Sequence, residues 1–486
     1  MDPSAPGKSR TNPYDRGRDN IPKSAGHYGS TRFSEVGLQQ FKQEQDFMQD
    51  HTEPSVARPK VVIIGGGFGG LYAARVLGNQ PLDVTLIDRT NHHLFQPLLY
   101  QVATAMLSPA EIAQPIRTIL KYARNIRVVM GTVEALDVSA KKVRTHVQEY
   151  PYDYLILAAG ARHSYFGNDH WEAFAPGLKT LSDALELRRR IVDAFEIAET
   201  TNDSELQKAA LTFVVIGAGP TGVEMAGSIS ELAKRTMVAD FRNIHTQEVR
   251  VVLLDAAPKV LPMFSDALCA SALRQLKTMD IDVRVGTKVL GVTYDGVQLE
   301  NEVIRARTVV WAAGNAASPL AKQLGCETDR QGRAVVTEDL SIPGHPEVFV
   351  IGDAANFSHQ GGKPLPGIAP FAMQTGEHAA RNILARLQSQ PSKLFKYWDK
   401  GSMATIGRNK AIADLKFVRL SGFLAWLSWL LIHLLFIVEL RNRIVIFFQW
   451  AWAYITYKHG ARLSYRPFRP AVPPKEGHRL MPEDIL

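Results

Sequence analysis

The sequence predicts an α/β fold in which two parallel-sheet domains of similar design are followed by a helical C-terminal module. Two glycine-rich loops predict the two domains, because each loop lies between a short β-branched run and a helical pattern. A long aliphatic and aromatic run near the C-terminus predicts the helical module. Hydrophobic residues make up 45% of the 486 residues and charged residues 21%, which is typical of a globular chain.

Net charge and cysteine content narrow the classes of function. The formal net charge of +8 favours an anionic partner, such as a membrane surface or a phosphorylated ligand. No motif or focused basic helix accompanies this charge, so we expect no nucleic-acid binding. The sequence has two cysteines, Cys269 and Cys326, and they lie far apart. This argues against a disulfide framework and against a zinc or iron–sulfur site, so we expect no metal.

The N-terminal segment, 1–57, is polar, with scattered Gly, Pro, Ser and Arg, and it lacks the apolar run of a secretory signal. Its composition predicts a disordered tail. An organelle-targeting segment is the alternative, but acidic residues such as Asp15 and Glu44 disfavour it.

The first glycine loop follows a predicted strand, Val61–Ile64, and has the pattern Gly65-x-Gly67-x-x-Gly70 before a helix. A second apolar strand ends on Asp88. Glycines let the backbone approach a pyrophosphate, and the helix N-terminus presents free N–H groups to it. An acid at this spacing can accept from ribose hydroxyls. The whole pattern predicts a Rossmann-like dinucleotide-binding domain, with an ordinary tight turn as the alternative.

The second glycine loop repeats this arrangement. A predicted strand, Phe213–Ile216, precedes Gly217-x-Gly219-x-x-Gly222, and the next strand ends on Asp255. A carboxylate can bond a ribose 2′-OH but repels a 2′-phosphate, so Asp255 favours NADH over NADPH. The alternative is a surface aspartate that merely ends a strand.

Two loops in one chain imply two nucleotides, and the natural pairing is a flavin in the first and a nicotinamide in the second. Three further segments support this pairing, because each is an apolar strand that ends in small residues beside which a cofactor can lie. The segments are Tyr152–Gly160, Thr308–Gly314 and Glu347–Asn356. In the last, Asp353 is suited to a ribityl or ribose hydroxyl.

From Pro59 to about Ala413 the sequence resembles the two-dinucleotide-binding-domain flavoproteins, and within them the type II NADH dehydrogenases, which are single-subunit NADH:quinone oxidoreductases. The residues that carry the closer resemblance are Asn91–Arg117, Gly217–Gly227, Gly367–Ala380 and Gly401–Asp414.

The resemblance implies non-covalent FAD, NADH as electron donor, and a membrane quinone, ubiquinone or menaquinone, as acceptor. The residues expected to bind FAD are Gly65, Gly67, Phe68, Gly69, Gly70, Asp88, Gly160, Gly352 and Asp353. Those expected to bind NADH are Gly217, Gly219, Pro220, Thr221, Gly222, Asp255 and Gly314. The quinone pocket is expected to include Ala369, Pro370, Phe371, Met373 and Gln374.

Glu224 and Gln374 are the expected catalytic residues. Quinone reduction consumes two protons, and the resemblance places Glu224 where nicotinamide meets flavin. The alternative role for Glu224 is a helix N-terminal acid that favours the dipole. Many members of the family have glutamine where Pro370 stands, so Gln374 is left as the polar partner of the quinone headgroup.

Other flavoprotein classes predict different residues or behaviour. Disulfide reductases need a redox cysteine pair on the first flavin helix, which this sequence lacks, and sulfide:quinone reductases need reactive cysteines that face the flavin. A non-respiratory NADH-binding flavoprotein of the apoptosis-inducing-factor kind remains an alternative, and it predicts slow quinone turnover.

The C-terminal run, Leu420–Val438, has about nineteen residues and is about 28 Å long as a helix, just enough to span a bilayer. A second run, Ile444–Tyr457, is too short to span and is rich in interface aromatics. Basic residues flank both runs, which suits one anionic leaflet. We favour a helical hairpin seated in one leaflet, with a single span or a buried core helix as alternatives.

We therefore expect a membrane-associated enzyme on the cytoplasmic face of the inner membrane, and a homodimer is a further expectation. The expected division is a polar tail (1–57), an FAD domain in two parts (58–165 and 306–410) around an NADH domain (166–305), a membrane hairpin (411–463) and a tail (464–486).

Overall fold

The computed structural model describes residues 58–457 and 460–464, all within the second of two units, Arg58–Leu486. The predicted N-terminal tail and residues 465–486 of the predicted C-terminal tail lie outside the described residues.

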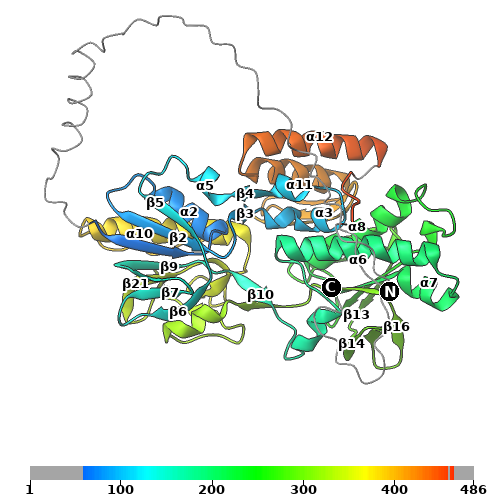
Figure 1. Cartoon of the computed structure of the whole chain (residues 1–486), viewed down its shortest axis with the longest axis horizontal. Coiled ribbons are helices and arrows are strands. Elements are labelled where there is room, and N and C mark those ends of the chain that lie inside the picture. The colour runs from blue at the N-terminus through cyan, green and yellow to red at the C-terminus, as the bar shows by residue number, and fades with distance from the viewer. Residues whose placement is uncertain (1–57, 458–459, 465–486) are drawn as a thin grey trace, which may run out of the picture. The chain divides into compact units, whose positions relative to one another are not determined.

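The first large sheet has six strands in the order β20-β21-β9-β1-β2-β5, and all neighbours are parallel except β20 and β21 (Figure 1). This confirms the predicted strands around the first glycine loop. Four of the five residues of β1 are buried, as the β-branched sequence predicts. The strands are β1 (Lys60–Ile64), β2 (Asp83–Asp88), β5 (Ile126–Met130), β9 (Tyr154–Leu157), β20 (Ser341–Ile342) and β21 (His345–Val350).

Two helices, α2 (Phe68–Leu77) and α10 (Ala369–Leu387), pack closely against each other beside this sheet. A Cβ atom built on Gly376 would lie 2.2 Å from the carbonyl oxygen of Gly69, so the two backbones touch there. Small residues at both positions are therefore a packing requirement between helices.

The second large sheet has four parallel strands in the order β13-β12-β11-β17. The strands are β11 (Thr212–Ile216), β12 (Arg250–Asp255), β13 (Ile281–Val285) and β17 (Thr308–Trp311), and the associated helices are α6 (Leu181–Thr200), α8 (Pro220–Glu231) and α9 (Asp266–Lys277). The sequence assigned Thr308–Trp311 to the second part of the FAD domain, but β17 pairs with β11. The assignment was wrong because a short apolar run reads the same in either buried parallel sheet.

Shorter elements complete these two regions. The smaller sheets contain β3 (His92–Leu94), β4 (Ala113–Pro115), β6 (Val133–Asp137), β7 (Lys142–Thr145), β8 (Glu149–Pro151), β10 (Ala161–His163), β14 (Gly291–Thr293), β15 (Gly296–Gln298), β16 (Val303–Arg305), β18 (Asn315–Ala317), β19 (Ala334–Val335) and β22 (Ala355–Asn356). The short helices are α3 (Leu99–Ala103), α4 (Pro109–Ile112), α5 (Ile116–Ile119) and α7 (Ser204–Ala210).

The C-terminal module begins with an antiparallel sheet of β23 (Ser402–Gly407), β24 (Lys410–Asp414) and β25 (Arg419–Ser421). The predicted module boundary at 411 cuts the β23–β24 hairpin, so the start of the module was placed too late. β23 lies directly on α8, because a Cβ atom built on Gly227 would lie 1.7 Å from the carbonyl oxygen of Ile406.

Two apolar helices, α11 (Phe423–Phe436) and α12 (Leu440–Thr456), end the module. The predicted nineteen-residue helix over Leu420–Val438 is wrong, because Arg419–Ser421 pairs as β25 and the helix ends before Ile437. α12 begins before Ile444 and includes Arg441 and Arg443, although basic residues were expected only to flank the second run. In the described part of the chain, no helix combines the length and apolar character needed to cross a membrane.

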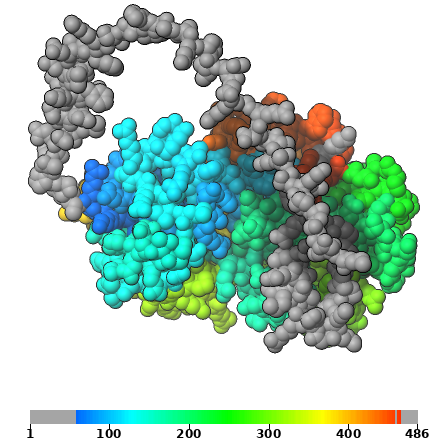
Figure 2. Space-filling view, in the orientation of Figure 1, coloured from blue at the N-terminus to red at the C-terminus, as the bar shows by residue number. Residues whose placement is uncertain are grey.

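Large apolar side chains remain exposed on both helices, whose residues appear in orange at the surface in Figure 2. The inner faces are buried instead, at Ala425 and Trp429 of α11 and at Ile446 and Trp450 of α12. The exposed apolar residues are Phe423, Leu424, Leu427, Leu431, Leu435, Phe436, Leu440, Ile444, Phe447, Phe448, Trp452 and Ile455.

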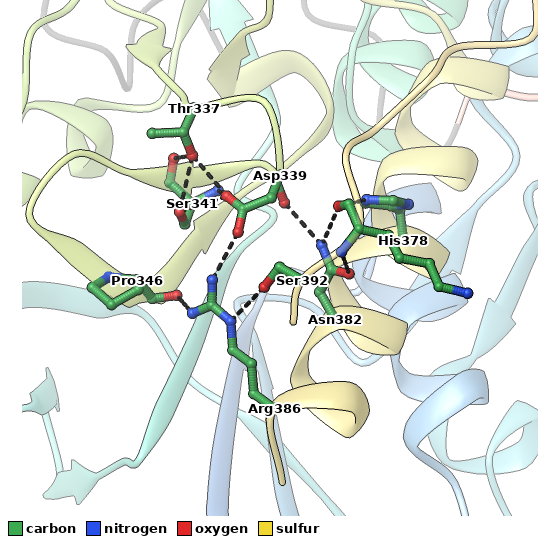
Figure 3. Close-up of polar contacts among 9 residues, drawn as sticks. Thr337, Asp339, Ser341, Pro346, His378, Asn382, Arg386 and Ser392 are labelled. Carbon is green, nitrogen blue, oxygen red and sulfur yellow. Dashed lines mark hydrogen bonds and ion pairs between the residues drawn. The ribbon is translucent and has the colours of Figure 1, made fainter. Parts of the chain in front are cut away.

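A polar network anchors the end of α10 (Figure 3). The Arg386 guanidinium lies 2.7 Å from an oxygen of Asp339 and donates to Ser392 at 2.6 Å. Asn382 donates to the carbonyl of Lys393 at 3.0 Å and accepts from its N–H at 2.9 Å. The network therefore holds the segment that leaves α10 and leads toward the C-terminal module.

Candidate functional site

The first glycine loop has the backbone geometry of a phosphate cradle. Gly65 has φ of 102°, which favours glycine, and a Cβ atom on Gly70 would lie 1.8 Å from the carbonyl oxygen of Gly65. Asp88 accepts from the N–H of Gly66 at 2.6 Å and from the N–H of Thr90 at 2.7 Å. The carboxylate therefore shapes the loop, in addition to any contact it makes with a ribose.

The other residues expected to bind FAD surround this loop from three segments. Gly160 and Gly352 have φ of 64° and 61° at the ends of β9 and β21, and a Cβ atom on Gly160 would meet no atom within 4 Å. Burial raises the pKa of Asp353, partly offset by the charges of Lys179 and Arg333. A largely buried carboxyl group beside open glycine backbone fits the hydroxyl-rich ribityl chain of FAD.

Two residues of the expected FAD set have a second role. Gly69 lies against Ile351 and Ala372, so its small size serves the α2–α10 contact. The ring of Phe68 lies edge-on to His93 at 5.1 Å and to Phe95 at 5.8 Å between centroids.

The second glycine loop repeats the geometry of the first. Gly217 has φ of 108°, and a Cβ atom on Gly222 would lie 1.7 Å from the carbonyl oxygen of Gly217. Asp255 accepts from the N–H of Ala218 at 2.5 Å and from the N–H of Ala257 at 2.7 Å. The two strand-end aspartates are therefore equivalent in position and in hydrogen bonding.

A pocket at the N-terminus of α8 brings together four of the residues expected to bind NADH: Gly219, Pro220, Thr221 and Gly314. Trp311, Ala312 and Ala313 of the pocket belong to Thr308–Gly314, which the sequence indicated as a strand beside a cofactor. Its other walls come from residues that no motif identified, namely His163, Ser164, Phe166, Leu178, Lys179, Asn315, Ala316, Arg330 and Gln331. Lys179 and Arg330 supply positive charge suited to a pyrophosphate. Their distance in sequence from the glycine loop explains why the pattern did not identify them.

Glu224 lies on α8, one turn after the second loop. Burial raises its pKa to about 8, although a hydrogen bond from the backbone of Thr405 opposes this shift. The carboxyl group is therefore mostly protonated at neutral pH. Burial raises the pKa of Tyr100 on α3, and the charged form of Glu224 adds to this rise, so these two side chains lie near each other. A neutral carboxyl group does not interact with the helix dipole as a charge would. The raised pKa and the hydrogen bond from the C-terminal module therefore favour a catalytic role for Glu224 over the helix-dipole role.

The residues expected to line the quinone pocket lie in the first turns of α10, but they differ in burial and in their contacts. Pro370 occupies the first turn, where its missing N–H costs nothing. Phe371 is 1% exposed and packs edge-on against Phe395 and Tyr397, so its expected pocket role is wrong and it belongs to the core. Gln374 donates to the carbonyl of Trp398 at 3.0 Å and accepts from its N–H at 3.0 Å. Ala369 and Met373 are half-buried.

An aromatic series joins the first loop to the C-terminal module. From Phe68 and Phe95 it continues to His433, whose ring lies 6.4 Å from that of Phe95 and stacks on Trp429 at 4.2 Å. Burial lowers the pKa of His433 to about 4, and its Nδ1 lies 2.7 Å from the carbonyl of Trp429. His433 is therefore neutral at physiological pH.

Two glycine cradles on two parallel sheets define a two-domain dinucleotide oxidoreductase. The family described as pyridine nucleotide-disulphide oxidoreductase matches residues 59–376, and the NDH2 C-terminal domain matches residues 399–459. Despite the disulphide in the first family's description, both cysteines are free: Cys269 is buried and donates to the carbonyl of Leu261 at 3.3 Å, and Cys326 is half-buried.

The chain is 46% identical over 428 residues to the type II NADH:quinone oxidoreductase NdhA of Mycobacterium tuberculosis, covering 84% of this chain and 90% of that protein. It is 31% identical to a type II NADH:quinone oxidoreductase of Staphylococcus haemolyticus, covering 73% and 89%. NDH2 of Plasmodium falciparum in complex with NADH shares the fold, with a TM-score of 0.77 at 20% identity, over 84% of this chain and 100% of that chain.

The chain therefore belongs to the type II NADH:quinone oxidoreductases, a family of FAD-dependent enzymes. These findings favour the predicted main function over the sulfide:quinone reductase and apoptosis-inducing-factor alternatives.

Proposed function

We propose that the protein passes a hydride from NADH to FAD and then two electrons to a membrane quinone, without pumping protons. The observation that carries this proposal is the position of Glu224. It follows the nicotinamide loop, its pKa is raised to about 8, and it accepts a hydrogen bond from the module that bears the exposed apolar helices. A proton donor therefore stands between the nucleotide domain and the membrane module.

The two cradles hold the two nucleotides in this proposal. The first loop, Asp88 and Asp353 hold FAD, which supplies the two-electron redox chemistry when it is bound. The second loop holds NADH, with Lys179 and Arg330 compensating the charge of its pyrophosphate and Asp255 excluding a 2′-phosphate.

Glu224 holds a proton at its carboxyl group and delivers it to a quinone oxygen, and a proton from solvent then replaces it. The overall reaction is NADH, one proton and quinone giving NAD⁺ and quinol, so hydrogen and electrons balance. Gln374 lies at the start of α10, where its amide is held by Trp398 and borders the quinone, which is ubiquinone or menaquinone.

In this proposal the protein is a homodimer. The helices α11 and α12 seat it in one leaflet, on the cytoplasmic face of the inner membrane. Two features support the seat. The outer faces of both helices are apolar and exposed, and the exposed Arg441 lies in the first turn of α12, where it can reach anionic headgroups.

One experiment tests the proposed function. The flavoprotein is purified from membranes, and NADH and NADPH oxidation is measured with ubiquinone and menaquinone analogues. Rapid NADH oxidation that requires added quinone is expected. A stable charge-transfer complex with slow quinone turnover would contradict the proposal.

The membrane seat has its own test. Replacement of Leu431 and Leu435 by lysine is expected to release the protein from vesicles, with turnover of short-tail quinones retained. The control is Val303→Lys on β16, which changes an equally exposed apolar residue outside the module. Equal vesicle binding by all three proteins would contradict the seat.

A further inference from the structure

A second pocket lies on the inner side of the membrane helices, apart from both glycine cradles. Its walls come from α3, the C-terminal half of α8, the β23–β24 turn, α11 and α12. Trp426, Trp429, Trp450, Tyr454 and Tyr457 supply an aromatic lining. The catalytic roles proposed above use none of these five side chains.

The charged side chains that line this pocket are more often basic than acidic. Arg235, Arg408 and Glu231 line it. Glu231 accepts a hydrogen bond from the N–H of Arg408 at 2.5 Å. Burial raises the pKa of Glu231, and this hydrogen bond and the charges of Lys410, Arg408 and Arg235 oppose the rise. Cations therefore outnumber carboxylates at this end of the pocket.

Arg408 is held as a fixed donor. Its guanidinium carbon lies 3.8 Å from the ring centroid of Tyr454 and 4.1 Å from that of Tyr457, so the side chain is stacked on two rings. Its Nη1 is buried and has no hydrogen-bond partner among the described residues. A buried guanidinium N–H without an acceptor is costly, so an anionic acceptor from outside the chain would stabilise this arrangement.

The occupant must combine an anionic group with an apolar body. The arginines suit a phosphate. The free volume of the pocket, about 80 Å³, admits a phosphate but not acyl chains, because Trp426 stacks on Tyr454 at 5.4 Å between ring centroids. The helices that wall the pocket expose Leu427, Phe448, Trp452 and Ile455 on their outer faces. The same two helices therefore carry both a wall of the pocket and the surface that the membrane seat places against lipid.

We propose that this pocket binds the headgroup of one anionic phospholipid, with its phosphate on Arg408 and Arg235 and its acyl chains along the exposed apolar faces of α11 and α12. This inference rests on the proposed membrane seat. The bound headgroup lies between α8 and the two helices, so the position of the membrane module depends on anionic lipid.

The test uses the full-length flavoprotein, delipidated in detergent and reloaded with micelles containing phosphatidylglycerol or phosphatidylcholine. Native mass spectrometry then counts the lipids retained. The wild type is expected to keep one phosphatidylglycerol and to lose phosphatidylcholine. Arg408→Gln is expected to weaken phosphatidylglycerol binding about tenfold or more, as for loss of a charge-assisted hydrogen bond.

Two further variants make the test specific. Arg419→Gln removes the same charge from an exposed site, where Arg419 is ion-paired with Asp414, and is expected to bind like the wild type. Ala453→Trp fills the pocket without changing charge, because Ala453 lines it, and is expected to abolish retention. Flavin content and short-tail quinone turnover are measured on every protein, so failure of the proposed enzyme activity is seen separately from failure of lipid binding.

Four outcomes would overturn the proposal. These are equal retention of both lipids by the wild type, unchanged phosphatidylglycerol binding in Arg408→Gln, and displacement of the lipid by inorganic phosphate at matched concentration. The fourth comes from the KM for a long-tail quinone, measured on the same proteins beside short-tail turnover. A change confined to that KM would make the pocket a site for the quinone tail.

Discussion

The side-chain amide of Gln374 pairs with the main chain of Trp398 in both directions, donating to its carbonyl and accepting from its N–H at 3.0 Å each. The indole of Trp398 is 69% exposed, and the Lys400 ammonium lies 5.0 Å from its ring and 5.9 Å from that of Phe436 at the end of α11. The expected quinone partner is therefore also a link between α10 and the membrane module.

Replacing Gln374 by alanine should loosen this link. The N–H and carbonyl of Trp398 lose their partners, so the free energy of unfolding should fall by about 1 kcal/mol and the KM for quinone should rise several-fold. Flavin reduction by NADH should be unchanged in stopped-flow measurements. Gln388→Ala at the C-cap of the same helix is the control. An unchanged quinone KM in Gln374→Ala would refute the role.

Replacing Glu224 by glutamine should remove the proton donor and keep the shape of the side chain. Loss of a positioned acid typically costs at least about a hundredfold in rate, so quinone turnover should fall to that extent while FAD content is retained. Because the pKa of Glu224 is raised to about 8, wild-type turnover should decline above pH 8. A Glu224→Gln variant that keeps full activity and this decline would contradict the relay.

The same shift has a consequence for stability. The folded state holds its proton on Glu224 up to about pH 8, whereas the unfolded chain releases it near the usual value of 4.5. Wild-type stability should therefore fall as pH rises from about 4.5 to 8, relative to Glu224→Gln. Urea unfolding of both proteins across this range measures the difference, and exposed Glu205→Gln should show no such trend.

Replacing Asp255 by asparagine should relax nucleotide selection. The change keeps a side-chain oxygen for the N–H of Ala218 or Ala257 but removes the charge that repels a 2′-phosphate. The ratio of kcat/KM for NADH over NADPH should fall about tenfold, as expected when one charge-dependent interaction is lost. Asp266→Asn, at an exposed position on α9, is the matched control. An unchanged ratio would show that selection lies elsewhere.

Replacing Arg386 by alanine should destabilise the network in Figure 3. Burial alone would raise the pKa of Asp339, but hydrogen bonds from Ser341 and Thr337 and the charge of Arg386 lower it. The stabilisation is therefore present above pH 3.8 and is lost as pH falls through the lowered pKa. Loss of this half-buried pair should cost about 2 kcal/mol at neutral pH, measured by urea unfolding. Arg381→Ala, at an exposed ion pair on the same helix, should cost much less.

Much of the fold could be predicted because local chemistry determines it. The strand–glycine–helix–acid pattern indicated both cradles, and Gly65 and Gly217 do adopt left-handed φ values. The membership of β17 in the second sheet depends on pairing between distant segments, which no local pattern encodes. Phe371 was misassigned because an apolar residue in a family motif looks the same whether it faces a ligand or the core.

The residues at which the apolar helices begin and end could not be predicted from composition either. Arg419–Ser421 forms a strand because it pairs with β24, a tertiary interaction that overrides the helical tendency of an apolar run. The polar residues Lys179 and Arg330 are brought to the nicotinamide pocket by the chain path alone.

The contact between Gly227 of α8 and Ile406 of β23 leaves no room for a side chain between the two backbones. Two elements that meet through long side chains can slide past each other, whereas two elements whose backbones are in direct contact move as one rigid body. Any movement of α8 must therefore carry β23 and the C-terminal module with it. In the proposed membrane seat, the lipid resists that movement and so helps to fix the distance between the electron donor and its acceptor.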